Sequence, residues 1–191
     1  MKLTSKKALE MLQEARGKTP RDGWIDHSIC VGYAAGVIAK TLNLDEEKAK
    51  TLGYIHDIGK LIDFKNHVMK GYNYLKELGY DDEYCNICLT HSYLNNDINC
   101  TQGEPCDIPF RTNFIKNHEY TIYEKIINLC DLMCIHKVVT MEKRIIDIIS
   151  RRKPHKNVFY HINEALKLKK YFDELLGHSV YDLFPEIKEG L

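Results

Sequence analysis

The chain has 191 residues, of which 44% are hydrophobic and 28% charged, and its 27 Lys and Arg residues balance its 27 Asp and Glu residues. This length allows one domain with a substantial core, and the composition is that of a globular rather than a disordered protein. The zero formal net charge gives no whole-protein argument for binding nucleic acid or membranes. No apolar run approaches the roughly 18 to 20 residues of a membrane span, and no signal-peptide segment follows the N-terminus, so we expect a cytoplasmic protein.

The first half of the chain predicts five successive helices from apolar residues spaced three and four apart. These helices span about residues 5–16, 24–42, 46–59, 67–78 and 82–91. His27 and His56 fall on the apolar faces of the second and third helices, and Gly59 is expected to end the third. His67 lies in the first turn of the fourth helix, and His91 closes the fifth.

The second half begins with a segment, residues 93–118, that is rich in Asn and Pro, lacks a clear period and predicts a long loop over a substrate pocket. Three more helices are predicted over about residues 120–137, 140–151 and 157–176, followed by a short turn near 181–184. No strand alternation or internal repeat is visible. We therefore predict an all-α fold, a single-domain bundle of about seven to eight helices over residues 1–191. Its core spans about 24–137, and the C-terminal helices, 138–191, pack on it.

Seven cysteines in such a chain are expected to be reduced thiols. Cys85 and Cys88 form a Cys-x-x-Cys pair, which leaves a structural zinc site with His91, Cys100 and Cys106 as an alternative. The pair lies inside a helical pattern without a knuckle glycine, which argues against that alternative.

Three polar side chains from three predicted helices, His27, His56 and Asp131, fall on apolar faces, and Asp57 adjoins His56. Each has a simpler explanation by itself, because a lone histidine on a core face is usually a satisfied core residue and Asp131 could be neutralised by Arg144. Together they are harder to explain, since buried carboxylates are costly unless they are paired or bind a cation. Imidazole nitrogen and carboxylate oxygen suit first-row divalent metals, so the pattern predicts a metal site.

The run His-Asp-Ile-Gly-Lys at residues 56–60, with His27 upstream and Asp131 downstream, resembles the HD-domain superfamily of metal-dependent phosphohydrolases, which is named for its adjacent His and Asp. The resemblance covers His27 to about Asp131. It implies an HD-domain-like fold in which His27, His56, Asp57 and Asp131 bind one metal ion.

Two further histidines indicate the subtype, because family members that hold two metals carry a His at each of the places of His67 and His91. The resemblance implies that these two residues hold a second ion and that Asp57 bridges the pair. The alternative is that His67 is a surface residue and His91 is incidental. We expect two divalent ions, drawn from Fe, Mn, Zn, Co and Mg.

Two such ions, about 3.5 to 4 Å apart, can bridge a hydroxide, lower its pKa and hold a phosphoryl oxygen for in-line attack. No nucleophile elbow, P-loop or Gly-x-Gly-x-x-Gly motif indicates a different chemistry. Asp57 is thus the predicted catalytic residue. Lys60 is either a catalytic, phosphate-binding group or a solvated helix-end lysine, and both interpretations stay open. Arg144 is the best candidate for a further anion contact, although the basic run at 151–156 behind it is typical of a solvated helix end.

We predict a hydrolase of phosphate esters or anhydrides, with a nucleotide as the small-molecule substrate. We expect no membrane partner, find no specific nucleic-acid signal, and leave a homo-oligomer open. The alternatives are a di-iron oxygenase of the same fold, which shares the ligand pattern, and a non-catalytic sensing module, which the complete ligand set disfavours. The remaining histidines match nothing in the pattern and are expected to be structural or exposed: His118, His136, His155, His161 and His178.

Overall fold

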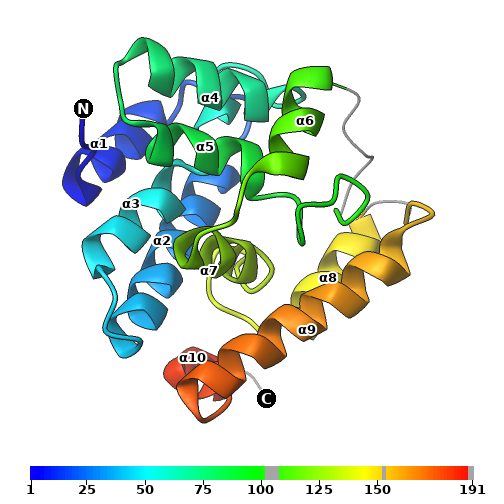
Figure 1. The fold of residues 1–191 in the computed structure, drawn as a ribbon. Helices are drawn as coiled ribbons and strands as arrows, with labels where there is room; N and C mark the ends of the chain where they lie inside the picture. The colour runs from blue at the N-terminus through cyan, green and yellow to red at the C-terminus, as the bar shows by residue number, and fades with distance from the viewer. Residues whose placement is uncertain (102–107, 152–153, 189–191) are drawn as a thin grey trace.

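The computed structural model describes residues 1–101, 108–151 and 154–188, and within these ranges the chain forms helices and no named strand (Figure 1). The α-helices are α1 (Ser5–Ala15), α2 (Gly23–Thr41), α3 (Glu46–Ile55), α4 (His67–Glu77), α5 (Asp82–Thr90), α6 (Pro109–Asn117), α7 (Ile122–Asp131), α8 (Met141–Arg151), α9 (Val158–Leu176) and α10 (Pro185–Lys188). Two short 3-10 helices are η1 (Ile58–Leu61) and η2 (Val180–Leu183). The predicted all-α fold is confirmed.

Side-chain caps fix where the helices around the centre of the molecule begin. Asp45 accepts a hydrogen bond from the backbone amide three residues on and starts α3. Thr121 and Glu124 form a reciprocal capping box at the start of α7. The buried Glu124 carboxylate also accepts a hydrogen bond from the Thr90 hydroxyl at 3.1 Å, which joins the beginning of α7 to the end of α5.

Helices α2 and α3 pack together unusually closely, because glycines face each other across the interface. A Cβ atom added at Gly53 of α3 would lie 2.5 Å from the Cα atom of Gly32 in α2, and one added at Gly32 would lie 2.3 Å from the Tyr54 ring. The two helices therefore need these glycines in order to approach. Their contact brings α2, which carries His27, against the helix that leads into His56.

The C-terminal helices share the buried core of the preceding ones. Helix α9 contacts α7 and η2, and Figure 1 shows it as the long orange helix along one edge of the molecule. Ala165, Phe172 and Phe184 belong to the same buried apolar cluster as side chains of α1 to α5 and of α7. The domain boundaries themselves stay a prediction. None of the helices in the described part of the chain combines the length and apolar character that a bilayer span requires.

The predicted loop over 93–118 is wrong in its second part, where α6 spans Pro109–Asn117. Proline is favourable at the first position of a helix, where its missing N–H has no intrahelical partner to lose, so Pro109 begins a helix instead of breaking one. Residues 102–107 lie outside the described part of the chain. The short α10 was not anticipated either.

The predicted helices at 46–59 and 120–137 are both too long. Helix α3 ends at Ile55, and α7 ends at Asp131. The chain beyond α7 turns while its apolar side chains stay buried, and Cys134 pairs with Val138 in an isolated bridge. A buried turn contains the same run of apolar residues as a buried helix, so the helix predicted from the sequence was too long at its C-terminal end.

Candidate metal centre

The structure gathers five of the six predicted ligands into two adjoining groups. One group consists of His27, His56 and Asp57, and the other of Asp57, His67 and His91. In each group, every residue offers one possible ligand atom, and these atoms all lie within 4.8 Å of one another. Asp57 belongs to both groups. Within the described ranges these are the His, Cys, Asp and Glu clusters whose geometry could hold a metal ion.

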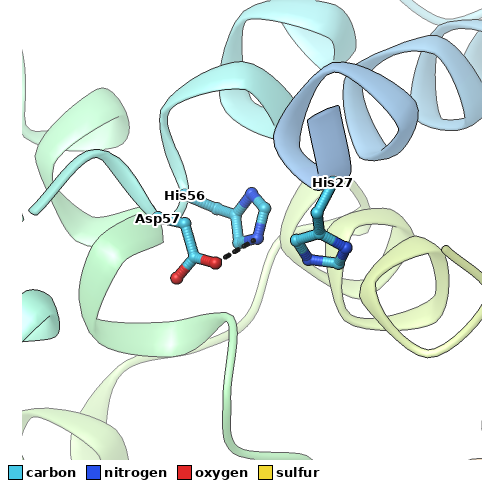
Figure 2. Close-up of side chains that lie close together, drawn as sticks. All are labelled: His27, His56 and Asp57. Carbon is cyan, nitrogen blue, oxygen red and sulfur yellow. Dashed lines mark ion pairs between the residues drawn. The ribbon is translucent and has the colours of Figure 1, made fainter. Parts of the chain in front are cut away.

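The first group lies where α2, the end of α3 and the end of α7 meet. Figure 2 shows the His56 side chain extending from the end of α3 toward the imidazole of His27 on α2, with the Asp57 carboxylate turned toward His56. The His56 Nε2 atom lies 3.5 Å from the Asp57 Oδ2 atom, and the His27 and His56 ring centroids are 5.3 Å apart. Asp131, the last residue of α7, joins this group because its Oδ1 atom lies 2.9 Å from His27 Nε2.

Arg144 does not take the role of counter-ion to Asp131 that the sequence left open. Its guanidinium pairs with Asp147 one turn along α8, at 3.1 Å, while Asp131 pairs with His27. The carboxylate of Asp131 is thus held within the histidine cluster.

The second group surrounds the other oxygen of Asp57. The Nε2 atoms of His67 and His91 lie 3.3 Å and 3.6 Å from Asp57 Oδ1. His67 is the first residue of α4, and His91 directly follows α5. Both residues lie at the helix ends where the sequence places them, and the two oxygens of one carboxylate face different histidines.

Three of the four histidines are held in one tautomer by the backbone. The Nδ1 atoms of His56, His67 and His91 lie 2.7, 3.0 and 3.0 Å from the carbonyl oxygen of the residue three positions earlier. Because a carbonyl oxygen only accepts, each Nδ1 carries the proton, and Nε2 keeps its lone pair on the side of Asp57. Such hydrogen bonds orient metal-binding imidazoles and raise their basicity.

The residues present fit a divalent metal. Three side-chain atoms at the centre are buried without a hydrogen-bond partner among the described residues, namely His27 Nδ1, His56 Nε2 and Asp57 Oδ1. His56 is 1% exposed and Asp57 3%. An unpaired buried polar atom costs free energy, and a cation bound between imidazole nitrogens and carboxylate oxygens removes that cost.

The protonation states of His67, His91 and Asp57 also suit metal ligands, which must be deprotonated to bind. Burial lowers the pKa of His67, and it lowers the pKa of His91 to about 3, so both rings are neutral at pH 7. For Asp57, burial raises the pKa, but the neighbouring Lys60 ammonium and histidine rings outweigh it and hold the pKa well below its usual value. Asp57 is therefore a carboxylate.

A cavity of about 970 Å³ opens beside the centre and is lined by residues of both metal-binding groups. The Lys60 ammonium donates a hydrogen bond to Asp57 Oδ2 in its wall, and Arg144 of α8 also lines the cavity. The lining contains six basic residues and three acidic ones. They are Arg21, Lys60, Lys65, Arg111, Arg144 and Arg151 against Asp57, Asp131 and Asp147.

Two lining residues escaped the sequence analysis although they hold parts of the site. Asn128 on α7 donates a hydrogen bond to the carbonyl oxygen of His91 at 2.8 Å, and so fixes the end of α5. Asn128 is a polar residue in an apolar run, one turn before Asp131, and this position could have indicated a buried side chain near the site. Arg111 on α6 donates to the carbonyl oxygen of Leu89 at 2.9 Å and lay in the segment expected to be a loop.

A third missed residue is His161, which was expected to be structural or exposed. It is buried, lines the cavity, and shares the buried face of α9 with Ala165 and Phe172. That spacing of four and seven residues marks a core-facing position and could have separated His161 from the exposed histidines.

The cysteine alternative gains no support from the described residues. The Cys88 thiol donates to the carbonyl oxygen of Ile55 at 3.6 Å, and the Cys85 thiol donates to that of Tyr80 at 3.4 Å. Cys106 lies outside the described residues, as do residues 152–153 of the basic run.

Curated relatives match about a third of the chain. Ribonuclease Y of Fervidobacterium nodosum is 41% identical over 68 residues, and that of Mycoplasma capricolum subsp. capricolum is 43% identical over 68 residues. Each alignment covers 34% of this chain but 13% of the relative. The chain thus matches only a small fraction of the length of these proteins.

Among solved structures, the fold is similar to the HD domain of the phosphodiesterase PgpH from L. monocytogenes. The TM-score is 0.48 at 18% sequence identity, over 87% of this chain and 95% of the other. Likeness at this level carries no conclusion about activity.

The family model for the HD domain matches residues 24–134, which is more than half of the chain and includes all six predicted ligands. This match supports the prediction of a metal-dependent hydrolase. We conclude that the chain belongs to the HD domain family.

Proposed function

We propose that the protein is a dinuclear metal-dependent phosphohydrolase that acts on a nucleotide. The observation that carries the proposal is that Asp57 belongs to both groups of possible ligands, with one oxygen near His56 and the other near His67 and His91. A carboxylate shared in this way is the natural bridge between two cations.

The residues divide into two sets around that bridge. His27, His56 and Asp131 would hold one ion together with Asp57, and His67 and His91 would hold the other. Bound divalent ions supply Lewis-acid activation of a water molecule and neutralisation of phosphoryl charge. The buried positions of His27, His56, Asp57 and His91 limit the access of bulk water to the centre.

The chain's own basic groups would position the substrate. Lys60 pairs with Asp57 at the cavity wall, where its ammonium can also meet a phosphoryl oxygen. Arg144 is held by Asp147 and lines the cavity, where its guanidinium can meet an anion.

A nucleotide suits both the size and the charge of the cavity. Its volume of about 970 Å³ is near the upper end of the usual range for small-ligand pockets, about 300 to 1,000 Å³. The excess of basic over acidic lining residues favours an anion. Since the matched relatives are named Ribonuclease Y, a short RNA is the natural competitor as substrate class. The cytoplasmic location and a homo-oligomer stay predictions.

The test is a substrate panel with metal-loaded protein. The wild type, loaded separately with Mn²⁺, Co²⁺ and Mg²⁺, is assayed for phosphate release from nucleoside mono-, di-, tri- and tetraphosphates and for cleavage of a short RNA. Asp57→Asn removes one carboxylate charge at the bridge, and Asp82→Asn is the matched control, because Asp82 is 76% exposed on α5.

We expect metal-dependent hydrolysis of at least one nucleotide by the wild type and Asp82→Asn, and loss of both metal and activity in Asp57→Asn. Hydrolysis of RNA alone would replace the nucleotide as substrate. Full activity of Asp57→Asn, or oxygen consumption by the iron-loaded protein without any phosphatase activity, would overturn the proposal.

A further inference from the structure

A stacked pair of side chains, Arg21 and Phe64, contributes to the wall of the same cavity. The Arg21 guanidinium lies over the Phe64 ring, with its Cζ atom 5.3 Å from the ring centroid. Both residues line the cavity. Arg21 is exposed, whereas Phe64 is half-buried beneath it. The guanidinium is therefore open to a solute that enters the cavity.

Two short stretches of the cavity wall connect this pair with the metal centre. Phe64 precedes the predicted ligand His67 by three residues, which span at most about 11 Å, and its carbonyl oxygen lies 3.0 Å from His67 Nδ1. Along the other stretch, Trp24 lines the cavity between Arg21 and the predicted ligand His27. The pair thus lies a short length of chain away from both groups of predicted ligands.

The basic residues that line the cavity differ in whether a carboxylate already balances their charge. Three of the six are paired in this way, namely Lys60 with Asp57, and Arg144 and Arg151 with Asp147. Arg21 and Lys65 have no carboxylate within ion-pair distance among the described residues. Both side chains are exposed and both residues line the cavity.

The acids that are nearest to these two cations in sequence make other hydrogen bonds. Asp22 accepts from the backbone amide of Gly17 at 2.9 Å and from the hydroxyl of Thr19 at 3.2 Å. Asp63 accepts from the backbone amide of Lys65 at 2.8 Å, not from its ammonium. The two cations therefore present positive charge to the cavity that no carboxylate of the described residues balances, which favours an anion as their ligand.

We propose that Arg21, held over Phe64, and Lys65 bind a second phosphoryl group of the substrate, remote from the one that is hydrolysed at the metal centre. The inference rests on the proposed function and narrows its substrate class to nucleotides with two or more phosphoryl groups. A guanidinium binds a phosphate through paired N–H donors. Stacking on a ring orients the guanidinium before the anion arrives and so reduces the cost of binding. The site then makes the enzyme prefer nucleoside polyphosphates to monophosphates.

Two substitutions test the parts of this site. Arg21→Met removes the guanidinium and its charge, and Phe64→Leu removes the ring beneath it. Lys18→Met is the matched control, because Lys18 is exposed in the same loop between α1 and α2 but is not among the residues that line the cavity. This control loses the same charge as Arg21→Met.

Each protein is titrated by calorimetry in excess Mg²⁺ with inorganic phosphate and with bismethylene triphosphonate, a triphosphate analogue whose P–C bonds resist hydrolysis. The wild type should bind the triphosphonate more tightly than phosphate. This preference should fall about tenfold in Arg21→Met, the effect of losing a hydrogen bond between charged groups. It should fall about threefold in Phe64→Leu, the effect of losing an exposed cation–π contact, and stay unchanged in Lys18→Met.

A second measurement uses turnover. The ratio of kcat/KM for a nucleoside triphosphate to kcat/KM for the monophosphate should fall in the same order, most in Arg21→Met, less in Phe64→Leu and not in Lys18→Met. Metal content and thermal stability are measured for all four proteins. A fall in the two ratios with metal content retained supports a binding site for the second phosphoryl group.

Equal affinity of the wild type for both probes would overturn the proposal, as would an unchanged preference in Arg21→Met. An equal fall in Arg21→Met and Lys18→Met would also overturn it, because it indicates a general effect of charge. A wild type that shows the preference through Arg21 but hydrolyses no nucleotide would leave the phosphate site standing and refute the proposed function. Nucleotide hydrolysis with the same preference in wild type and Arg21→Met would refute the inference alone.

Discussion

Gly59 provides a direct test of how the second group of ligands is positioned. A Cβ atom at this residue would lie 1.8 Å from the carbonyl oxygen of His67 and 2.4 Å from the backbone nitrogen of Gly71, whereas ordinary contact begins near 3.4 Å. In Gly59→Ala, α4 would therefore have to retreat by about 1.5 Å. Metal–ligand distances tolerate about 0.2 Å, so His67 would leave the site while His27 and His56 stayed.

We expect Gly59→Ala to bind one metal ion per chain instead of two, to lose at least tenfold in kcat, and to be destabilised by about 1 to 3 kcal/mol. The assay is elemental analysis after metal loading, together with chemical denaturation. Gly79→Ala is a control matched in stability, because Gly79 has φ +76° and open space around it, so the strain of about 1 kcal/mol arises away from the site. Two tightly bound ions in Gly59→Ala would refute the reasoning.

Three further predictions concern individual side chains. His67→Ala and His91→Ala should each retain one metal ion by elemental analysis and lose phosphate release. Full activity in both variants would exclude a catalytic role for the second group of ligands. Lys60→Met should lower kcat/KM about 10- to 100-fold with metal content unchanged, since hydrogen bonds to charged groups are worth about 1.5 to 3 kcal/mol. Lys60→Arg should restore part of the lost kcat/KM. If Lys60 is only a solvated lysine, both variants will have the kinetics of the wild type. Because burial lowers the pKa of His161 to about 4, the unfolded chain binds more protons below pH 6.5, so stability should fall as the pH falls from about 6.5 to 4. In His161→Gln, the loss of unfolding free energy over this pH range should be smaller by up to about 3 kcal/mol, as measured by chemical denaturation of the metal-free protein. The same pH dependence in wild type and variant would contradict the lowered pKa of His161.

The ligand set could be predicted from the sequence because each ligand sits in a strong local pattern. His27 and His56 interrupt apolar helix faces, Asp131 is the lone charge in an apolar run, and His67 and His91 fall at helix ends that caps and glycines mark. Local periodicity places such residues on elements, and the chemistry of buried imidazole and carboxylate groups then favours bringing them together.

What could not be predicted depends on tertiary contacts. Gly59 does not end α3, as the sequence predicted, but lies in η1, where the absence of a side chain allows the close approach of the first turn of α4. Helix α6 begins at a proline that looked like a breaker, and the buried turn after Asp131 resembles helix in its apolar pattern. The place of His161 in the cavity wall depends on how α9 packs on α7, which no local pattern encodes.

The central claim is that Asp57 bridges two metal ions. Anomalous X-ray diffraction from crystals of the Mn²⁺-loaded protein tests it most directly, because it counts and locates the ions independently of activity. The account predicts two peaks, one among His27, His56, Asp57 and Asp131 and the other among Asp57, His67 and His91. A single peak at saturating metal, or two peaks of which only one contacts Asp57, would contradict it.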